Sequence, residues 1–129
     1  MSVQSAWDKY SNSCVCGEKY KNNCAHYLSN ALIEAGYSEI DGGKGANFRI
    51  VNGFCVCRSG RPVRAKELRD WFGKKWSFHS SPPSDGIVLV YQEERGQGHV
   101  LLKKYKDGKS TGHQGTGDFP GWPVQQYYY

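Results

Sequence analysis

The clearest pattern along the chain is a repeat of apolar and small residues with helical spacing. These residues are Cys24, Tyr27, Leu28, Ala31, Leu32 and Ala35. Intervals of three and four place them on one face of a helix. Asn22 or Asn23 can cap its start, and Gly36 can end it in the left-handed conformation. The pattern therefore predicts a buried helix with Cys24 in its first turn.

A second, shorter helix is predicted before the middle of the chain. Ala65, Leu68, Trp71 and Phe72 share one face at helical spacing. Pro62 suits a first helical position, and we expect the helix to end at Gly73. A helix of this kind is expected to pack against a sheet.

The last third of the chain changes to the period of β-strands. Residues 87–91 form an apolar run, residues 92–98 are polar and glycine-rich, and His99 opens the next run, 100–102. Asp107-Gly108 is a strong two-residue hairpin signal. We expect this hairpin to bring the stretch around His113 beside the stretch around His99. The segments 42–53 and 119–129 are expected to be loop or edge-strand material. Together the patterns predict an α+β fold.

Length and composition limit the class of protein. The chain has 129 residues, which suits one domain covering 1–129. With 38% hydrophobic residues, 14% aromatics and 16 glycines, it is too apolar for a disordered chain and too glycine-rich for a helical bundle. The longest apolar runs are far short of the roughly 20 residues that cross a membrane, so no membrane insertion is expected. No classical signal peptide is visible at the N-terminus, so export would need another route.

The net charge of +5 suits nucleic acid, an anionic membrane or an acidic polymer such as cell wall, but it does not choose among them. The densest basic cluster straddles the predicted hairpin and does not form one helical face. It consists of Lys103, Lys104, Lys106 and Lys109. We expect these lysines to form a solvated surface and not a nucleic-acid-binding patch. We therefore expect no nucleic-acid partner.

Five cysteines leave one thiol after pairing. Cys14 and Cys16 form one C-x-C pair, Cys55 and Cys57 form another, and Cys24 stands apart. Two disulfides joining the pairs are the favoured interpretation, each contributing about 2–4 kcal/mol in an oxidising compartment. Free thiols and a four-thiolate zinc site remain open alternatives, although one residue between ligands is a poor fit for zinc.

Cys24 and a histidine can form a nucleophile and its base. A thiol at a helix start feels the positive end of the macrodipole, which favours the thiolate; the alternative is that Cys24 is simply the first small residue of the buried stripe. His26 lies about 200° around the helix from Cys24 and is expected at the surface, and His79 lies in an apparent linker. His99, at a strand start with a polar neighbour alongside, is the best candidate base; the alternative is a solvent-exposed histidine.

Two blocks of sequence resemble a known family. Asn22-Asn23-Cys24-Ala25-His26-Tyr27-Leu28-Ser29-Asn30-Ala31-Leu32, continuing to Tyr37, resembles the nucleophile helix of papain-like, NlpC-type cell-wall peptidases, and is most similar to that of the type VI secretion amidase effectors. Ser84-Asp85-Gly86-Ile87-Val88-Leu89-Val90 followed by Gly98-His99-Val100 resembles the family's catalytic-histidine hairpin. The matching blocks cover residues 20–37 and 84–114, in the family's order.

The resemblance implies a papain-like α+β fold, with the nucleophile helix packed on a small antiparallel sheet. It implies Cys24 as nucleophile, His99 as base and His113 as the third catalytic residue, with Gln114 and Asp118 as neighbours that can serve instead. Tyr20 or Asn22 can supply a second oxyanion donor. This chemistry needs no metal and no organic cofactor.

The resemblance further implies a monomeric antibacterial toxin delivered into the periplasm of a target bacterium. Its substrate would be peptidoglycan, cut in the peptide stem between γ-D-glutamate and meso-diaminopimelate, with the muramoyl–L-alanine amide as second choice. A cognate inhibitor (immunity) protein would accompany it. The alternative from another class is a non-catalytic, disulfide-stapled module that binds an anionic polymer through its lysines and tail aromatics.

Overall fold

The computed structural model describes residues 1–129 and has an α+β fold with two antiparallel sheets. The helices are α1 (Val3–Lys9), α2 (Cys24–Glu34) and α3 (Ala65–Lys75), with a 3-10 turn η1 (Ser38–Ile40). The strands are β1 (Arg49–Val51), β2 (Phe54–Val56), β3 (Phe78–His79), β4 (Gly86–Glu94), β5 (Gln97–Lys106), β6 (Lys109–Gln114) and β7 (Val124–Tyr128).

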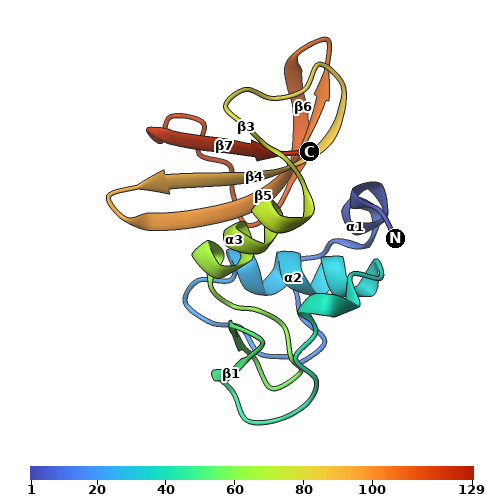
Figure 1. Cartoon of the computed structure of the whole chain (residues 1–129), viewed down its shortest axis with the longest axis vertical. Coiled ribbons are helices and arrows are strands. Elements are labelled where there is room, and N and C mark those ends of the chain that lie inside the picture. Colours follow the sequence, from blue (N-terminus) through green and yellow to red (C-terminus); the bar gives the residue numbers. More distant parts are fainter.

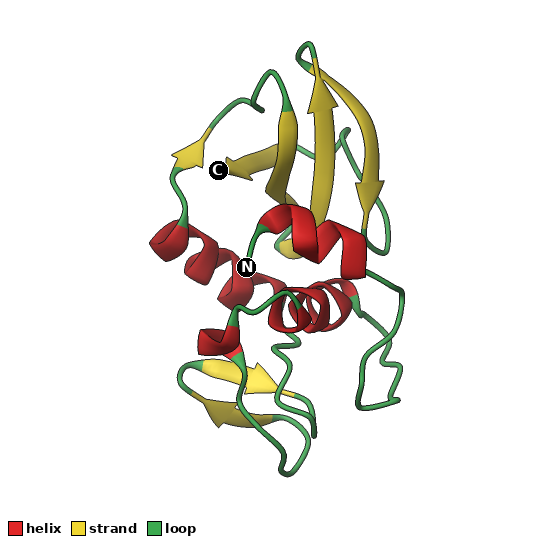
Figure 2. Ribbon diagram, turned by 90° about the vertical axis from the view of Figure 1, so that its right-hand side faces the viewer, coloured by secondary structure: helices red, strands yellow, loops and turns green.

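The elements are arranged in three tiers. The five-stranded sheet, in the order β3-β7-β4-β5-β6, lies at one end of the molecule, and the β1–β2 hairpin lies at the other. The helices lie between them (Figures 1 and 2). None of these helices combines the length and the apolar character needed to cross a bilayer.

Helix α2 confirms the prediction made from the hydrophobic repeat. Its buried face packs into the largest cluster of buried apolar residues, which also contains Leu89, Val100 and Leu102 of the sheet. The helix ends in a Schellman motif, in which Tyr37 N–H donates to the Leu32 carbonyl at 3.0 Å. Gly36 adopts a φ of 107°, which only glycine takes up without strain.

The second predicted helix exists, but both of its predicted ends are wrong. Leu68, Trp71 and Phe72 are buried as expected. The helix starts three residues after Pro62, because this proline pairs with Val56 in an isolated bridge instead. It continues through Gly73 to Lys75. A glycine inside a helix lowers the stability by only about 1 kcal/mol relative to alanine, so it need not end the helix.

The hairpins of the large sheet lie where the sequence predicted them, but the strands of the first hairpin are longer than predicted. Asp107 and Gly108 both have positive φ, as the two-residue turn between β5 and β6 requires. The predicted turn over 92–98 is mostly strand, because Arg95-Gly96 forms a second such two-residue turn and lets β4 and β5 pair up to it.

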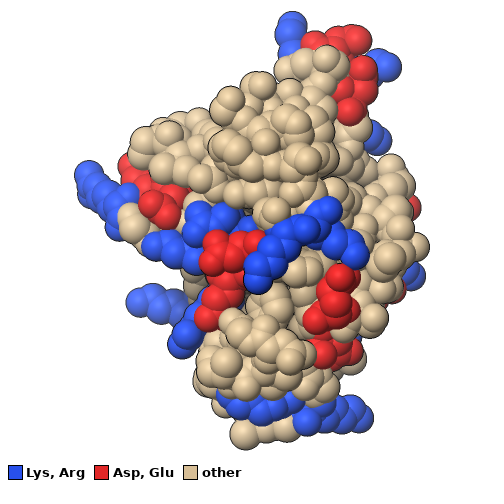
Figure 3. Space-filling model, viewed as in Figure 1, with Lys and Arg blue, Asp and Glu red and all other residues tan.

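Charged side chains of both signs alternate on the face drawn in Figure 3, which carries no single basic patch. Lys66 pairs with Glu93 at 3.7 Å and Arg69 with Asp70 at 2.8 Å. One member of the predicted basic cluster is not at the surface: Lys103 is 5% exposed and pairs with Asp118. The alternation of sides along β5 points it inward, unlike Lys104.

Candidate functional site

Cys24 is the first residue of α2 and its side chain is buried in the main core beside Val100. Burial raises the pKa of its thiol, while the N–H groups of Val100, Ala25 and Cys24 itself act to lower it. Burial outweighs these donors, so the pKa lies above its ordinary value. The expectation of a lowered pKa, made from the helix dipole alone, is therefore wrong for the resting protein.

The sulfur of Cys24 borders the edge of strand β5. Strand β6 ends at Gln114, which pairs with Leu102, and does not extend to Val100. The Val100 N–H, which acts on the Cys24 sulfur, belongs to the peptide unit that joins His99 to Val100. The candidate nucleophile thus lies next to the backbone of the candidate base.

His99 leaves β5 on the face opposite to Val100, because successive side chains of a strand alternate. Its Nε2 atom lies 2.7 Å from the carbonyl oxygen of Gly117, and its ring packs against Phe119 with 4.7 Å between centroids. A carbonyl only accepts hydrogen bonds, so Nε2 carries the proton and Nδ1 keeps its lone pair. Nδ1 has no hydrogen-bond partner within the protein and is not sealed from solvent.

The pKa of His99 is lowered, chiefly because burial disfavours the charged ring. The hydrogen bond to Gly117 and the charge of Asp118 oppose this effect, and the charge of His113 adds to it. The ring consequently stays neutral, with Nδ1 unprotonated, down to a lower pH than a free imidazole does.

A cavity of about 450 Å³ opens beside the His99 ring. Its lining comes from the segment before α2, the start of β5 and the loop before β7. The lining residues are Lys21, Asn22, Gln97, His99, Thr116, Phe119 and Trp122. Phe119 and Trp122 stack on each other with 4.5 Å between ring centroids. The cavity therefore offers a cation and a flat aromatic wall around a neutral imidazole.

Cys24 does not line this cavity, and no hydrogen bond joins its sulfur to His99. Asn22 connects the two, because it lines the cavity and its Oδ1 atom accepts the Cys24 N–H at 3.3 Å. The other proposed oxyanion donor, Tyr20, donates instead to Asn47 at 3.0 Å. Asn22 is the better placed of the two for an oxyanion at Cys24.

The structure does not bring His113 to His99. His113 pairs with Lys103 in the β5–β6 ladder, four residues along β5 from His99, which is a backbone rise of about 13 Å along the strand. Its side chain is exposed, and no hydrogen bond joins it to the His99 ring. The contact that orients the His99 ring comes from the Gly117 backbone and not from a third polar side chain.

The two alternatives to His113 are also engaged elsewhere. Gln114 donates to the Trp7 carbonyl at 3.2 Å. Asp118 accepts from Gln92 at 2.8 Å and pairs with Lys103 at 3.0 Å. Asp118 acts on His99 only through its charge.

His26 is not the surface histidine that the helix geometry suggested. It is fully buried, with Nε2 lying 3.3 Å from the sulfur of Cys16 and Nδ1 lying 3.1 Å from Oδ1 of Asn23. His26 does point away from Cys24, but the segment before α2 covers that side of the helix and buries the ring. His79 lies in β3 and stacks on Tyr129 with 3.8 Å between centroids.

All five cysteines are free and buried. The two disulfides favoured from the sequence are therefore not formed in the structure. Cys14, Cys16 and Cys57 do come together, and the sulfurs of Cys14 and Cys57 lie 4.0 Å apart. Cys55 does not join them. It lies in β2, where its N–H donates to Glu67 at 2.7 Å, and His26 occupies the fourth place in the group.

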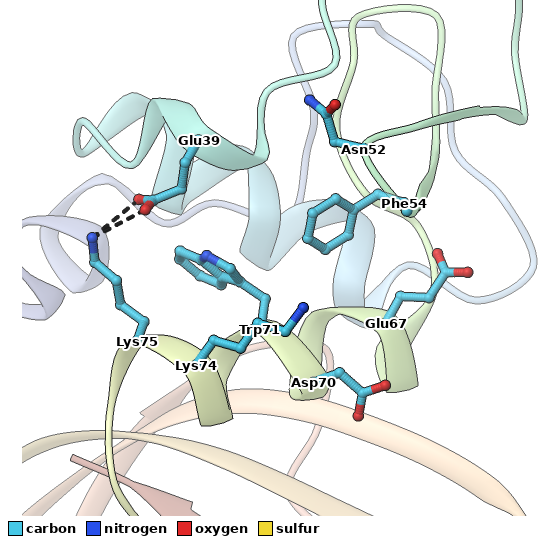
Figure 4. Close-up of a pocket in the computed structure, with 9 residues that line it drawn as sticks. Glu39, Asn52, Phe54, Glu67, Asp70, Trp71, Lys74 and Lys75 are labelled. Carbon is cyan, nitrogen blue, oxygen red and sulfur yellow. Dashed lines mark hydrogen bonds and ion pairs between the residues drawn. The ribbon is translucent and has the colours of Figure 1, made fainter.

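A second cavity, of about 500 Å³, lies between α3, η1 and the β1–β2 turn (Figure 4). Trp71 forms its floor, and Lys75 closes one side through an ion pair with Glu39 at 3.1 Å. Its lining contains no cysteine or histidine, so it offers no nucleophile.

No family model, curated protein or solved structure was found to match this chain.

Proposed function

We propose that the chain is a papain-like, NlpC-type cysteine amidase that hydrolyses an amide bond in the peptide stem of bacterial peptidoglycan. The observation that carries the proposal is the position of the Cys24 sulfur. It lies at the start of a buried helix and against the peptide unit of His99, whose neutral imidazole lines the adjoining cavity. A cysteine and a histidine in this relation are the two groups that acyl transfer needs.

In the proposed reaction, Nδ1 of His99 takes the proton of the Cys24 thiol, and the thiolate attacks the scissile carbonyl carbon. The oxyanion forms at the start of α2, where the Cys24 N–H and the side-chain amide of Asn22 can donate to it. The imidazolium then returns its proton to the leaving amine. A water, deprotonated by the same Nδ1, hydrolyses the thioester and restores the thiol.

The resting arrangement requires one rearrangement before this reaction. The thiol and the imidazole are not yet hydrogen-bonded, and the Cys24 N–H is occupied by Asn22. Binding of a substrate carbonyl in place of the Asn22 oxygen would free this N–H and turn the amide nitrogen of Asn22 toward the oxyanion. Catalytic hydrogen bonds commonly tighten only in the substrate complex.

The cavity supports a stem peptide as the substrate. Lys21 supplies a positive charge for a peptide carboxylate, and the stacked rings of Phe119 and Trp122 supply an apolar wall. The bond between γ-D-glutamate and meso-diaminopimelate is the proposed target, with the muramoyl–L-alanine amide as second choice. In this proposal the protein is an effector that acts as a monomer in a target periplasm and is blocked by a dedicated inhibitor protein.

The test is digestion of purified sacculi, with mass spectrometry of the released fragments to identify the bond that is cut. Cys24→Ala should reduce release at least about a thousandfold. Cys55→Ala, which removes a buried thiol away from the cavity, is the matched control and should retain activity. Undiminished release by Cys24→Ala would refute the enzyme proposal.

The second candidate is a non-catalytic module that binds an anionic polymer. The observation that favours it is the buried, unactivated thiol of Cys24, whose pKa is raised. This candidate predicts that wild type and Cys24→Ala bind sacculi equally and that neither releases fragments.

A further inference from the structure

Four side chains from three separate segments place metal-binding atoms around one point. Cys14 and Cys16 come from the segment before α2, His26 from the first turn of α2, and Cys57 from the residue after β2. Their three sulfurs and the imidazole nitrogen all lie within 4.8 Å of one another, and all four residues are buried. We propose that this group, the CCHC cluster, binds a structural zinc ion.

The spacing of the ligand atoms matches tetrahedral zinc. Bond lengths of about 2.3 Å to sulfur and 2.0–2.1 Å to nitrogen imply about 3.8 Å between two sulfurs and about 3.6 Å between sulfur and nitrogen. The sulfurs of Cys14 and Cys57 are 4.0 Å apart, and the sulfur of Cys16 is 3.3 Å from Nε2 of His26. Three thiolates and one imidazole form a common set of ligands for structural zinc.

The imidazole is held in the tautomer that a metal needs. Nδ2 of Asn23 donates to the Tyr20 carbonyl at 2.7 Å, which fixes the orientation of this amide and leaves its oxygen facing His26. That oxygen can only accept, so Nδ1 of His26 carries the proton. The lone pair of Nε2 therefore points at the sulfurs. A hydrogen bond on the far ring nitrogen is the usual support of a zinc-bound histidine.

The backbone also favours thiolates in the cluster. Cys16 N–H donates to the sulfur of Cys14 at 3.5 Å, and Glu18 N–H donates to the sulfur of Cys16 at 3.4 Å. Gly17, with φ of 77°, makes the tight turn that aims these donors. Arg58, which also pairs with Glu18 at 2.9 Å, donates a hydrogen bond to the Cys16 carbonyl beside the cluster. Zinc binding would displace the remaining thiol protons into solvent.

A disulfide between Cys14 and Cys57 is the competing interpretation. It accounts for two of the four groups and leaves the approach of Cys16 and the aligned lone pair of His26 without a purpose. Zinc accounts for all four. It would tie the N-terminal segment and the end of β2 to the start of α2, two residues from Cys24. This proposal departs from the expectation that the protein needs no metal, and it holds whether or not Cys24 is catalytic.

The first test uses the reduced wild-type protein with zinc alone. We expect one zinc per chain by elemental analysis after desalting, and a fall in melting temperature of at least about 5 °C when a strong chelator removes it. Replacement by cobalt(II) should produce thiolate charge-transfer bands and the intense visible bands of tetrahedral cobalt. These measurements need no variant and no enzymatic activity.

The second test compares variants for metal content. His26→Ala and Cys57→Ser should lose stoichiometric zinc, whereas Cys55→Ser and Cys24→Ala should retain one per chain. Reduced wild-type protein that holds no zinc, with a melting temperature unaffected by the chelator, would overturn the proposal, as would a purified metal-free protein lighter by the two hydrogens of one disulfide. Loss of zinc in Cys55→Ser but not in His26→Ala would also overturn the ligand set.

Discussion

The Nε2 atom of His99 lies 2.7 Å from the carbonyl oxygen of Gly117. Leu102 pairs with Gln114 in the β5–β6 ladder, and continuing that register by three residues places Gly117 opposite His99. A backbone carbonyl thus orients the imidazole, in the place where the family resemblance implies a polar side chain. The tautomer it selects leaves Nδ1 available as the base of the proposed amidase.

The first prediction separates the roles of two histidines. His113→Ala should change the free energy of unfolding by less than about 0.5 kcal/mol, because the side chain is exposed. Its activity on sacculi should remain within about threefold of wild type, whereas His99→Ala should lose at least about a hundredfold. Assays of kcat/KM on both variants check this. Equal losses would restore His113 to the orienting role.

The second prediction concerns Asn22 as an oxyanion donor. Asn22→Ala should lower kcat about a hundredfold or more with a smaller change in KM. Asn22→Asp keeps an oxygen acceptor for the Cys24 N–H but removes the amide donor, so it should stay equally slow. Thr116→Ala, on the same cavity wall, is the control and should have a nearly unchanged kcat. A fast Asn22→Asp variant would exclude the donor role.

The third prediction is a pH profile of kcat/KM. The proposed reaction needs His99 neutral and Cys24 protonated at the outset. Burial lowers the pKa of His99, so the acid limb should lie below about 6.5, the ordinary value for histidine. Burial raises the pKa of Cys24, so the alkaline limb should lie above about 8.5. A profile with an alkaline limb near neutrality would indicate a preformed thiolate–imidazolium pair instead.

The fourth prediction uses two glycines with opposite backbone requirements. Gly73→Ala, inside α3, should stabilise the protein by about 0.5–1 kcal/mol, since its new Cβ would meet only Tyr128 at 3.7 Å. Gly36→Ala should destabilise it by about 1–2 kcal/mol, because its φ of 107° is strained for alanine. Urea unfolding of both variants measures the two changes. Stabilisation by both would contradict the Schellman geometry.

The fifth prediction concerns the buried pair of Lys103 and Asp118, whose charged atoms lie 3.0 Å apart. Asp118→Ala should cost about 3 kcal/mol, because it leaves the Lys103 charge buried without a partner. Lys103→Met combined with Asp118→Leu should cost less than Asp118→Ala alone. Urea unfolding of wild type and the two variants measures these changes in the free energy of unfolding. A larger destabilisation in the double variant than in Asp118→Ala would contradict the prediction.

The same pair predicts how stability depends on pH. Burial alone would raise the pKa of Asp118, but the hydrogen bonds from Gln92 and Lys103 and nearby positive charge hold it below its ordinary value. The unfolded state therefore binds a proton first as the pH falls. The stabilisation is complete above about 3.9, the pKa of an unfolded aspartate, and is lost as the pH falls through the lower folded value. Asp118→Asn should flatten this part of the curve.

Local patterns predicted the elements whose boundaries depend on nearby residues. The stripe from Cys24 to Ala35 and the stop at Gly36 predicted α2, because helix periodicity and a left-handed cap are both local properties. Asp107-Gly108 predicted the hairpin for the same reason. The start of α3 was missed because Pro62 is used in a tertiary bridge, which no local preference reveals.

The turn sequence limits which residues can lie opposite His99, but it does not by itself give Gly117. A two-residue turn at Asp107-Gly108 pairs His99 with residue 116, and the irregularity at Lys104 and Tyr105 shifts that partner by one, to Gly117. By either count, His113 lies three or four positions from the residue opposite His99. A backbone acceptor has no signature in residue type, so the sequence does not indicate that a carbonyl orients the His99 ring.

The amino-acid sequence by itself determined the buried helix α2, the antiparallel hairpin that carries His99 and the α+β class, since these follow from periodicity and turn chemistry over short stretches. Only the tertiary structure decided what surrounds each reactive group. Burial outweighs the helix dipole at Cys24, a backbone carbonyl orients His99, and His26 takes the place of Cys55 among the clustered thiols. Desolvation and convergence of ligands depend on segments far apart in the chain, so no local pattern records them.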